Sequence, residues 1–385
     1  MGEGTAMKEP MRVLHVLGGV GLGGAESRIM DLYRCIDREK LQFDFLVHQS
    51  VPGYYEEEIQ ELGGRIYRVP RFRLYNILTY RKALRAFFKE HHAFRAVHGH
   101  MTSTAAVYLP IAKKCGIPVT IAHARSAGVD KGMKGIVTRL LRIPLRKKCD
   151  YMFACSGLAA EAVFGKKNAL AGKVTIVPNA IDAGAFRFCA ETRAEMRRTL
   201  GIAEKFVIGH VGRFHYAKNH EYLLEVFAQI VKKHDNAILL LLGEGERKEE
   251  MQQKAAYLGI AEKVRFCGNQ KETWKYYQAM DFFVFPSRFE GLPGTVVEAQ
   301  SAGLRCLISD TIAKECIITE LAASKSIAES PAAWAEYVLA NREYERTDRY
   351  GQIRAAGFDV RRQAEWYGRF YRNGNADCGK DMGHK

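Results

Sequence analysis

The amino-acid sequence predicts an α/β protein made of two doubly wound domains, each built on a parallel sheet. The chain has 385 residues, which is too many for one ordinary hydrophobic core. Short β-branched runs alternate with amphipathic stretches from end to end, and this alternation is typical of parallel α/β layers. A polar, small-residue stretch over Asp182–Arg193 follows the turn at Pro178-Asn179 and separates the two halves. We therefore expect domains at residues 11–185 and 186–358, a closing helix at 359–373 and a disordered tail at 374–385.

The elements of each domain are expected where the periodicity changes. Strands of the first domain are expected at Met11–Leu17, Phe43–His48, Arg65–Val69, Ala96–His98, Val119–Ala122, Tyr151–Ala154 and Val174–Val177. Strands of the second domain are expected at Phe206–Val211, Ala237–Leu242, Val264–Cys267, Phe282–Phe285 and Arg305–Ile308. Helices are expected between them, among others at Ala25–Ile36, Thr79–Lys89, Asn219–Lys233 and Lys248–Leu258. The closing helix, Val360–Arg372, carries four aromatic residues for packing, which are Trp366, Tyr367, Phe370 and Tyr371.

Composition favours a globular protein of the cytoplasm. No apolar run reaches the roughly 18 to 20 residues that span a bilayer, and the first ten residues lack the apolar core of a secretory signal. The nine cysteines are scattered without C-x-x-C spacing, so we expect free thiols in a reducing compartment rather than a zinc or disulfide framework. No D-x-D pair is present, which removes the simplest carboxylate site for a divalent metal on a diphosphate.

The formal net charge of +15 is unusual and suggests a polyanionic partner. Much of it falls in Arg65–Arg85 and Arg139–Lys148, where basic residues are interleaved with Leu, Ile, Phe and Tyr. These stretches are interpreted either as a solvated basic face or as a contact with an anionic membrane surface. No helix-turn-helix, zinc-finger or RNA-binding pattern accompanies the charge, so no nucleic-acid partner is expected.

The first predicted strand runs into a glycine-rich loop with the G-x-G-x-x-G spacing of a dinucleotide fingerprint, at residues 19–24. That fingerprint also needs an acidic residue at the end of the second strand, and here the strand ends in Val47-His48-Gln49. An NAD-dependent enzyme is therefore disfavoured. Gly23 and Gly24 still allow a ligand to approach the backbone at the start of a helix.

Four loops of the second domain share one requirement, which is holding a diphosphate. They follow four predicted strands and are Val211–Asn219, Gly243–Gly245, Gly268–Asn269 and Phe289–Glu298. The first of them presents a guanidinium and an ammonium, Arg213 and Lys218, which are groups that neutralise a phosphate leaving group. The glycines Gly212, Gly243 and Gly268, with Asn269, make the tight turns at the strand ends.

The fourth loop contains two glutamates with different expected tasks. Pro293 and its neighbouring glycines prevent a continuous helix, so Glu290 lies on a loop and a helix starts near Thr295. The free N–H groups of that helix start are suited to phosphate. Glu298 follows about one turn into the helix, where a carboxylate can accept hydrogen bonds from ribose hydroxyls.

With these segments in place, the sequence resembles the retaining glycosyltransferases of family 4. It is most like the bacterial members that assemble exopolysaccharide and capsule, through RVLHVLGG, VPNAID, GHVGRFHYAKNH and FEGLPGTVVEAQSAG. The resemblance covers roughly Met11 to Tyr371, and its E-x7-E segment with an upstream R-x4-K is specific. It implies the GT-B fold, in which two Rossmann-like domains face a central cleft.

The resemblance also implies a role for individual residues. Arg213 and Lys218 match the pair that contacts the donor diphosphate, Glu290 the glutamate near the transferred sugar, and Glu298 the ribose-binding glutamate. Gly291, Leu292 and Pro293 match the loop beneath sugar and phosphates, and Gly23 and Gly24 match the amino-terminal loop that faces the cleft. His123 falls where related enzymes place a histidine close to the sugar, and it is alternatively a structural histidine, as His98 and His100 are expected to be. Two positions depart from the family pattern, Ala180 in place of glycine and Arg305 in place of proline.

These observations predict a metal-independent glycosyltransferase without a cofactor, and the resemblance implies that it retains the anomeric configuration. Its donor is expected to be a nucleotide diphosphate hexose, with UDP as the expected nucleotide, and its acceptor a lipid-linked saccharide or an oligosaccharide. We then expect the basic stretches of the first domain to bind the enzyme peripherally to the inner face of the cell membrane. Three alternatives stay open at this point, which are a sugar-nucleotide 2-epimerase of the same fold, a non-catalytic polyanion-binding protein and the disfavoured NAD-dependent enzyme.

Overall fold

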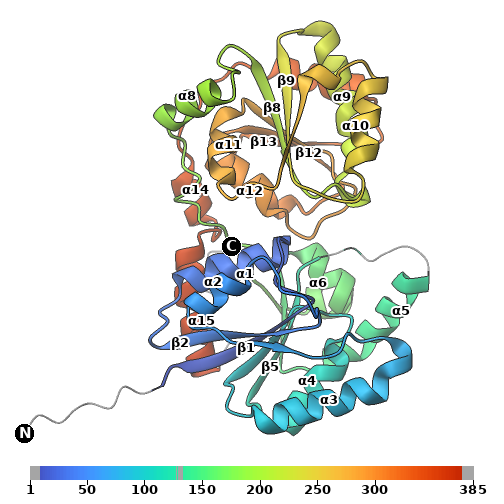
Figure 1. Cartoon of the computed structure of the whole chain (residues 1–385), viewed down its shortest axis with the longest axis vertical. Coiled ribbons are helices and arrows are strands. Elements are labelled where there is room, and N and C mark those ends of the chain that lie inside the picture. Colours follow the sequence, from blue (N-terminus) through green and yellow to red (C-terminus); the bar gives the residue numbers. More distant parts are fainter. Residues whose placement is uncertain (1–8, 127, 129–132, 375–385) are drawn as a thin grey trace, which may run out of the picture. The chain divides into compact units, whose positions relative to one another are not determined.

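The computed structural model describes residues 9–126, 128 and 133–374, and it divides into two compact units. Unit 1 comprises Met1–Pro178 together with Val360–Lys385, and unit 2 comprises Asn179–Asp359. The chain therefore enters unit 2 once, leaves it once and returns to unit 1 for its last helix (Figure 1). The expected tail lies outside the described residues from 375 onward.

Unit 1 contains a seven-stranded parallel sheet in the order β3-β2-β1-β4-β5-β6-β7. Its strands are β1 (Met11–Leu17), β2 (Leu41–Val47), β3 (Ile66–Arg68), β4 (Ala96–Gly99), β5 (Val119–Ala124), β6 (Tyr151–Ala154) and β7 (Val174–Ile176). Every residue of β2 and of β5 is buried, as expected for a parallel sheet that is covered on both faces.

Helices cover both faces of this sheet (Figure 1). They are α1 (Gly24–Cys35), α2 (Glu56–Glu61), α3 (Ile77–Glu90), α4 (Ala105–Lys114), α5 (Met133–Arg142), α6 (Gly157–Phe164), α7 (Lys166–Leu170) and α15 (Val360–Asn373), with 3-10 turns η1 (Leu74–Asn76) and η2 (Ile143–Lys147). The last helix, α15, packs against α1, and Trp366, Tyr367, Phe370 and Tyr371 are each at most 1% exposed. The aromatic residues of the predicted closing helix therefore belong to the core of unit 1.

Unit 2 contains a six-stranded parallel sheet in the order β10-β9-β8-β11-β12-β13. Its strands are β8 (Phe206–Val211), β9 (Ala237–Leu242), β10 (Val264–Gly268), β11 (Phe282–Phe285), β12 (Arg305–Ser309) and β13 (Ala322–Lys325). All expected strands are present, and β13 is an additional one. The expectation of two doubly wound parallel sheets is confirmed.

The helices of unit 2 again form two layers. The layer of α9 (His220–Lys233), α10 (Lys248–Tyr257) and α13 (Pro331–Ala340) packs on the sheet around a core that includes Leu224, Phe227 and Trp334. The other layer contains α8 (Ala190–Thr199), α11 (Thr273–Ala279), α12 (Gly294–Ser301) and α14 (Tyr350–Ala355).

The strand orders fix where ligands bind in each unit. In a doubly wound sheet, ligands lie beyond the carboxyl ends of the strands, at the point where the strand order reverses. This point falls between β1 and β4 in unit 1 and between β8 and β11 in unit 2. In unit 2 it brings together the loops after β8 and β11, which are the loops that contain Lys218 and Glu290.

Candidate active site

The loops after β8 and β11 meet at the switch point of unit 2. The backbone N–H of Arg288 donates to the carbonyl of Ala217 at 2.7 Å, which joins the two loops. Lys218 Nζ lies 2.7 Å from Glu290 Oε1, and the two side chains are only 18% and 20% exposed. The ammonium also lies 4.6 Å from the centre of the Phe285 ring, the last residue of β11. Two predicted catalytic residues far apart in the sequence therefore form one partly buried ion pair.

The loop that carries Glu290 leads directly into α12. This helix begins at Gly294 with Pro293 at its N-cap, one residue before the predicted start. Its first backbone N–H groups have no helical acceptor, and the helix dipole adds positive potential there. Thr295 Oγ1 in the first turn is buried and lacks a hydrogen-bond partner among the described residues. The start of α12 is therefore suited to an anion that can accept hydrogen bonds.

Glu298 lies in the same helix but in a different environment. It is 4% exposed, and Tyr277 from α11 donates a hydrogen bond to its Oε2 at 2.8 Å. The loop before it is fixed by Asn179, whose Nδ2 donates to the carbonyl of Leu292 at 2.9 Å. The two glutamates are thus held separately, Glu290 on the loop by a lysine and Glu298 inside the helix by a tyrosine.

The predicted glycines allow the strand-end loops to pack backbone against backbone. Gly243 has φ +134°, and a Cβ there would lie 2.3 Å from the carbonyl oxygen of Gly212. A Cβ at Gly212 would lie 3.2 Å from Cδ of Lys218, so a side chain would press on the lysine stem. The N–H of Gly243 in turn donates to the carbonyl of Gly268 at 2.8 Å. These close backbone contacts require glycine whether or not a ligand is bound.

Arg213 and Asn269 are exposed at the rim of this site. The Arg213 side chain is 71% exposed, and its Nη2 lies 3.1 Å from Glu246 Oε2. Its guanidinium is therefore paired away from Lys218 and Glu290 in this structure. The diphosphate role of Arg213 stays a prediction, as do the donor-binding roles of the glycines and of Asn269.

In unit 1, the glycine loop lies at the corresponding switch point. Gly23 is the N-cap of α1, and a Cβ at Gly24 would meet nothing within 4 Å. The carboxylate of Glu26 folds back over the helix start, because a Cβ at Gly23 would lie 2.1 Å from Glu26 Oε2. Burial raises the pKa of this carboxyl group. An internal carboxylate thus occupies the start of α1, next to open space at Gly24.

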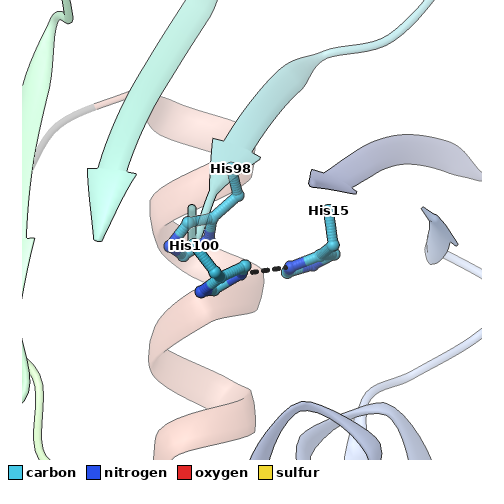
Figure 2. A group of neighbouring side chains, drawn as sticks. All are labelled: His15, His98 and His100. Atoms are coloured by element: carbon cyan, nitrogen blue, oxygen red, sulfur yellow. Dashed lines mark hydrogen bonds between the residues drawn. The ribbon is translucent and has the colours of Figure 1, made fainter. Parts of the chain in front are cut away.

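Four histidines of unit 1 form a buried hydrogen-bonded group beneath that edge. Figure 2 shows three of them, His15 from β1, His98 from β4 and His100 directly after β4. His15 Nδ1 and His100 Nε2 are 3.0 Å apart, and His98 Nε2 and His123 Nδ1 are also 3.0 Å apart. His98 Nδ1 lies 2.6 Å from the Tyr371 hydroxyl of α15. Burial lowers the pKa of all four imidazoles, so they are neutral near pH 7.

The hydrogen bonds determine the tautomers of two of these rings. Nε of Arg125 donates to His100 Nδ1 at 3.3 Å, and a guanidinium cannot accept. His100 is neutral, so its proton is on Nε2, which donates to His15 Nδ1. The proton of His15 is then on Nε2, an atom without a hydrogen-bond partner among the described residues.

The ring nitrogens of His15, His98 and His100 lie within 4.8 Å of one another, which raises the question of a metal ion. The contacts do not fit one. The nitrogens that would converge already share hydrogen bonds, and the charged group that lowers the pKa of all three rings is the cation of Arg125. A second cation is unfavourable there, so we interpret the group as a hydrogen-bonded network.

His123 is completely buried, with 0% of its side chain exposed. Its proximity to a sugar stays a prediction. Four residues with contacts in these two groups were not assigned a role from the sequence, and they are His15, Arg125, Asn179 and Tyr277. For His15 and Arg125, the sequence offered one indication of a shared site, which is that each lies in or directly after a strand next to β4.

The structure has the GT-B fold. HepE from Anabaena, solved in complex with UDP-glucose, superimposes with a TM-score of 0.72 at 16% identity and covers 97% of this chain and 98% of its own. Sucrose-phosphate synthase from Thermosynechococcus elongatus gives a TM-score of 0.75 at 17% identity and covers 94% of this chain and 98% of its own. Both are glycosyltransferases of this fold, and the class predicted from the sequence is confirmed.

Sequence comparison then gives the family. A model described as glycosyl transferase 4-like domain matches residues 23–180, and one described as glycosyl transferases group 1 matches residues 192–349. The protein of Bacillus subtilis (strain 168) named "Putative glycosyltransferase EpsF" is 35% identical over 337 residues, which cover 85% of this chain and 86% of EpsF. The chain belongs to this family of glycosyltransferases and is a transferase enzyme.

Two further relatives have more specific names. The UDP-Gal:alpha-D-GlcNAc-diphosphoundecaprenol alpha-1,3-galactosyltransferase of Escherichia coli is 22% identical over 322 residues, or 80% of this chain and 81% of that protein. The capsular polysaccharide biosynthesis glycosyltransferase CapH of Staphylococcus aureus is 22% identical over 309 residues, or 79% of this chain and 82% of that protein. Over the described ranges of this chain, no helix has both the length and the apolar character needed to cross a bilayer.

Proposed function

We propose that the enzyme transfers a hexosyl group from a UDP-sugar to a saccharide acceptor, with retention of the anomeric configuration and without a metal ion. The observation that carries this proposal is the ion pair of Lys218 and Glu290 beside the start of α12. A nucleotide diphosphate is stabilised as it leaves by groups such as a lysine and the N-terminus of a helix that follows a glycine-containing loop. The protein can thus supply the positive charge that a metal supplies in other sites.

The chemistry assigns one task to each group. When the bond between the anomeric carbon and the β-phosphate oxygen breaks, negative charge builds on the phosphate, and Lys218 with the N–H groups of α12 binds it. Arg213, from the same loop as Lys218, supplies a second cation. Glu290 contacts the sugar, and Glu298 accepts hydrogen bonds from the ribose. The acceptor hydroxyl bonds to the same face of the anomeric carbon, and its proton goes to the departing phosphate.

The names of the relatives support the choice of substrates. HepE has been solved with UDP-glucose, and the E. coli relative is named for a UDP-sugar donor and a diphosphoundecaprenol-linked acceptor. We infer a UDP-hexose donor and a lipid-linked saccharide acceptor for this chain, in exopolysaccharide or capsule biosynthesis. The reaction then takes place in the cytoplasm, at the inner face of the membrane.

The first test is the melting temperature of the protein with UDP, GDP, ADP and their hexose conjugates. A ligand that binds only the folded state at 100 times its Kd adds about 2.7 kcal/mol of stability, so UDP and one UDP-hexose are expected to raise the melting temperature. No shift with any of them would refute the proposal.

The second test identifies the reaction. Incubation with the UDP-hexose and a lipid-linked acceptor is expected to give a glycoside whose anomeric proton coupling matches that of the donor. Conversion of the UDP-sugar to an epimer without acceptor would instead support a 2-epimerase.

A further inference from the structure

Two segments of unit 1 that flank α4 expose apolar side chains that a globular surface usually covers. In η1 and the first turn of α3, Leu74 is 57% exposed, Tyr75 81% and Leu78 80%. In α5 and η2, Ile136 is 53% exposed, Leu140 59% and Ile143 55%. We call these six residues the amphipathic patch. Residues 136, 140 and 143 are spaced by four and three, so they share one face of α5 and of the start of η2 that continues it.

Both segments belong to the same helix layer of unit 1. The helices α3 and α5 each pack against α4, and Figure 1 shows all three on the same side of the sheet. The buried face of α3 is formed by Tyr80, Leu84 and Phe88, each 0% exposed, so its core contacts do not require Leu74 or Leu78. The exposed leucines are therefore additional to the packing of the fold, which needs a separate explanation.

The charge around the amphipathic patch has one sign. Residues 65–89 and 133–149 contain fourteen lysines and arginines and no aspartate or glutamate, against a formal net charge of +15 for the whole chain. Arg73, Lys82 and Arg139 are exposed within these segments. Apolar side chains among basic ones are the composition of a helix that lies in the headgroup region of an anionic bilayer.

We propose that the amphipathic patch inserts into the surface of an anionic bilayer. The six apolar side chains enter the boundary between headgroups and acyl chains, and the basic side chains bind the lipid phosphates. This inference deepens the proposed function, because it places unit 1 where a lipid-linked acceptor is. Its test measures binding to vesicles and does not depend on the transfer reaction.

The first experiment reports insertion at a single position. Tyr75→Trp places an indole in the amphipathic patch, and Tyr257→Trp places one at an equally exposed position of unit 2, where the tyrosine is 89% exposed. With vesicles of phosphatidylglycerol and phosphatidylcholine, the Tyr75→Trp protein is expected to show a blue shift in indole fluorescence relative to the parent. The Tyr257→Trp protein is expected to show none. Equal shifts at both positions, or none at either, would overturn the proposal.

The second experiment separates the apolar and the basic contributions by vesicle sedimentation. Leu78→Gln combined with Leu140→Gln is expected to weaken binding by at least about tenfold, and Lys82→Glu by roughly fivefold or more with a shallower salt dependence. Leu170→Gln is the matched control, since Leu170 is 73% exposed on α7 outside the amphipathic patch. It is expected to bind as the parent does.

Three results would overturn the proposal. They are a parent protein that does not sediment with anionic vesicles, a double variant that binds like the parent, and a self-association of the parent that the double variant loses. The UDP-induced rise in melting temperature is expected in every variant, so a failure here is distinguishable from a failure of the proposed function.

Discussion

Replacing Lys218 with alanine tests the central feature of the site. The change removes an ammonium that lies 2.7 Å from Glu290 and 4.6 Å from the Phe285 ring centre. In the reaction, this ammonium faces the charge that develops on the departing phosphate. We expect kcat to fall far more than the donor KM rises, because the negative charge on the phosphate is larger in the transition state than in the bound donor.

The size of the effect follows from the burial of the pair. At the 2.7 Å that separates Lys218 from Glu290 and an effective dielectric constant of about 20, two unit charges interact by roughly 6 kcal/mol before desolvation is subtracted, and we take this as the scale for the same ammonium next to a phosphate oxygen. The net contribution to the transition state is smaller, about 2.7 to 4 kcal/mol by analogy with the loss of one oxyanion donor, which lowers kcat by about 10² to 10³. Because the side chains of Lys218 and Glu290 are only 18% and 20% exposed, solvent screening does not remove this contribution.

The assay is donor-dependent transfer under saturating acceptor, with kcat and KM measured separately. Lys233→Ala is the matched control, because Lys233 forms an exposed pair with Glu336 at 2.9 Å, with exposed fractions of 54% and 65%. Its effect on kcat is expected to be negligible. A Lys218→Ala protein with kcat within about threefold of the parent would refute the role assigned to the lysine.

Three further predictions concern other parts of the molecule. Glu298→Gln is expected to raise the Kd for UDP by about tenfold or more, since hydrogen bonds to a charged group contribute about 1.5 to 3 kcal/mol, and unchanged UDP binding in titration calorimetry would contradict the ribose role. EDTA is expected to leave the transfer rate unchanged, and a loss that Mg²⁺ or Mn²⁺ restores would contradict a metal-independent reaction. The free energy of unfolding is expected to fall as the pH drops below about 6.5. Burial in the folded chain lowers the pKa values of His15, His98 and His123, so the unfolded chain binds more protons than the folded chain. Each of these histidines then lowers the free energy of unfolding by about 1.4 kcal/mol per pH unit. Denaturant unfolding at pH 7.5, 6.5 and 5.5 measures this, and a flat profile would exclude it.

The sequence predicted the sheet elements well because their signals are local. The strands Phe206–Val211 and Ala237–Leu242 have the predicted bounds, since each apolar run ends at the glycine that opens the next loop, Gly212 or Gly243. The strand Ala322–Lys325 was missed because its four residues, AASK, have little β-branched character and it pairs with β12 alone. Its existence depends on the neighbouring strand rather than on its own residues.

The arrangement of the site was less predictable because it depends on strand order. The sequence named Lys218 and Glu290, but their contact requires β8 and β11 to be neighbours, which no local pattern reports. The R-x4-K spacing suggested that Arg213 and Lys218 act side by side, whereas Arg213 pairs with Glu246 here. His15 looked like one polar residue in an apolar strand, and only its pairing with His98 across β1 and β4 shows that it belongs to a network.

The return of the chain to unit 1 imposes an order on its folding during synthesis. The sheet of unit 1 emerges first, but the helix whose Tyr371 meets His98 emerges after all of unit 2. At about 5 to 20 residues per second, the residues between Pro178 and Tyr371 take roughly 10 to 40 s to translate. During that time Phe43 and Phe153, which contact α15 aromatics in the finished protein, lack part of their cover. Unit 2 is continuous in sequence and can complete its own core first, so the part of the chain made first is the part that is finished last.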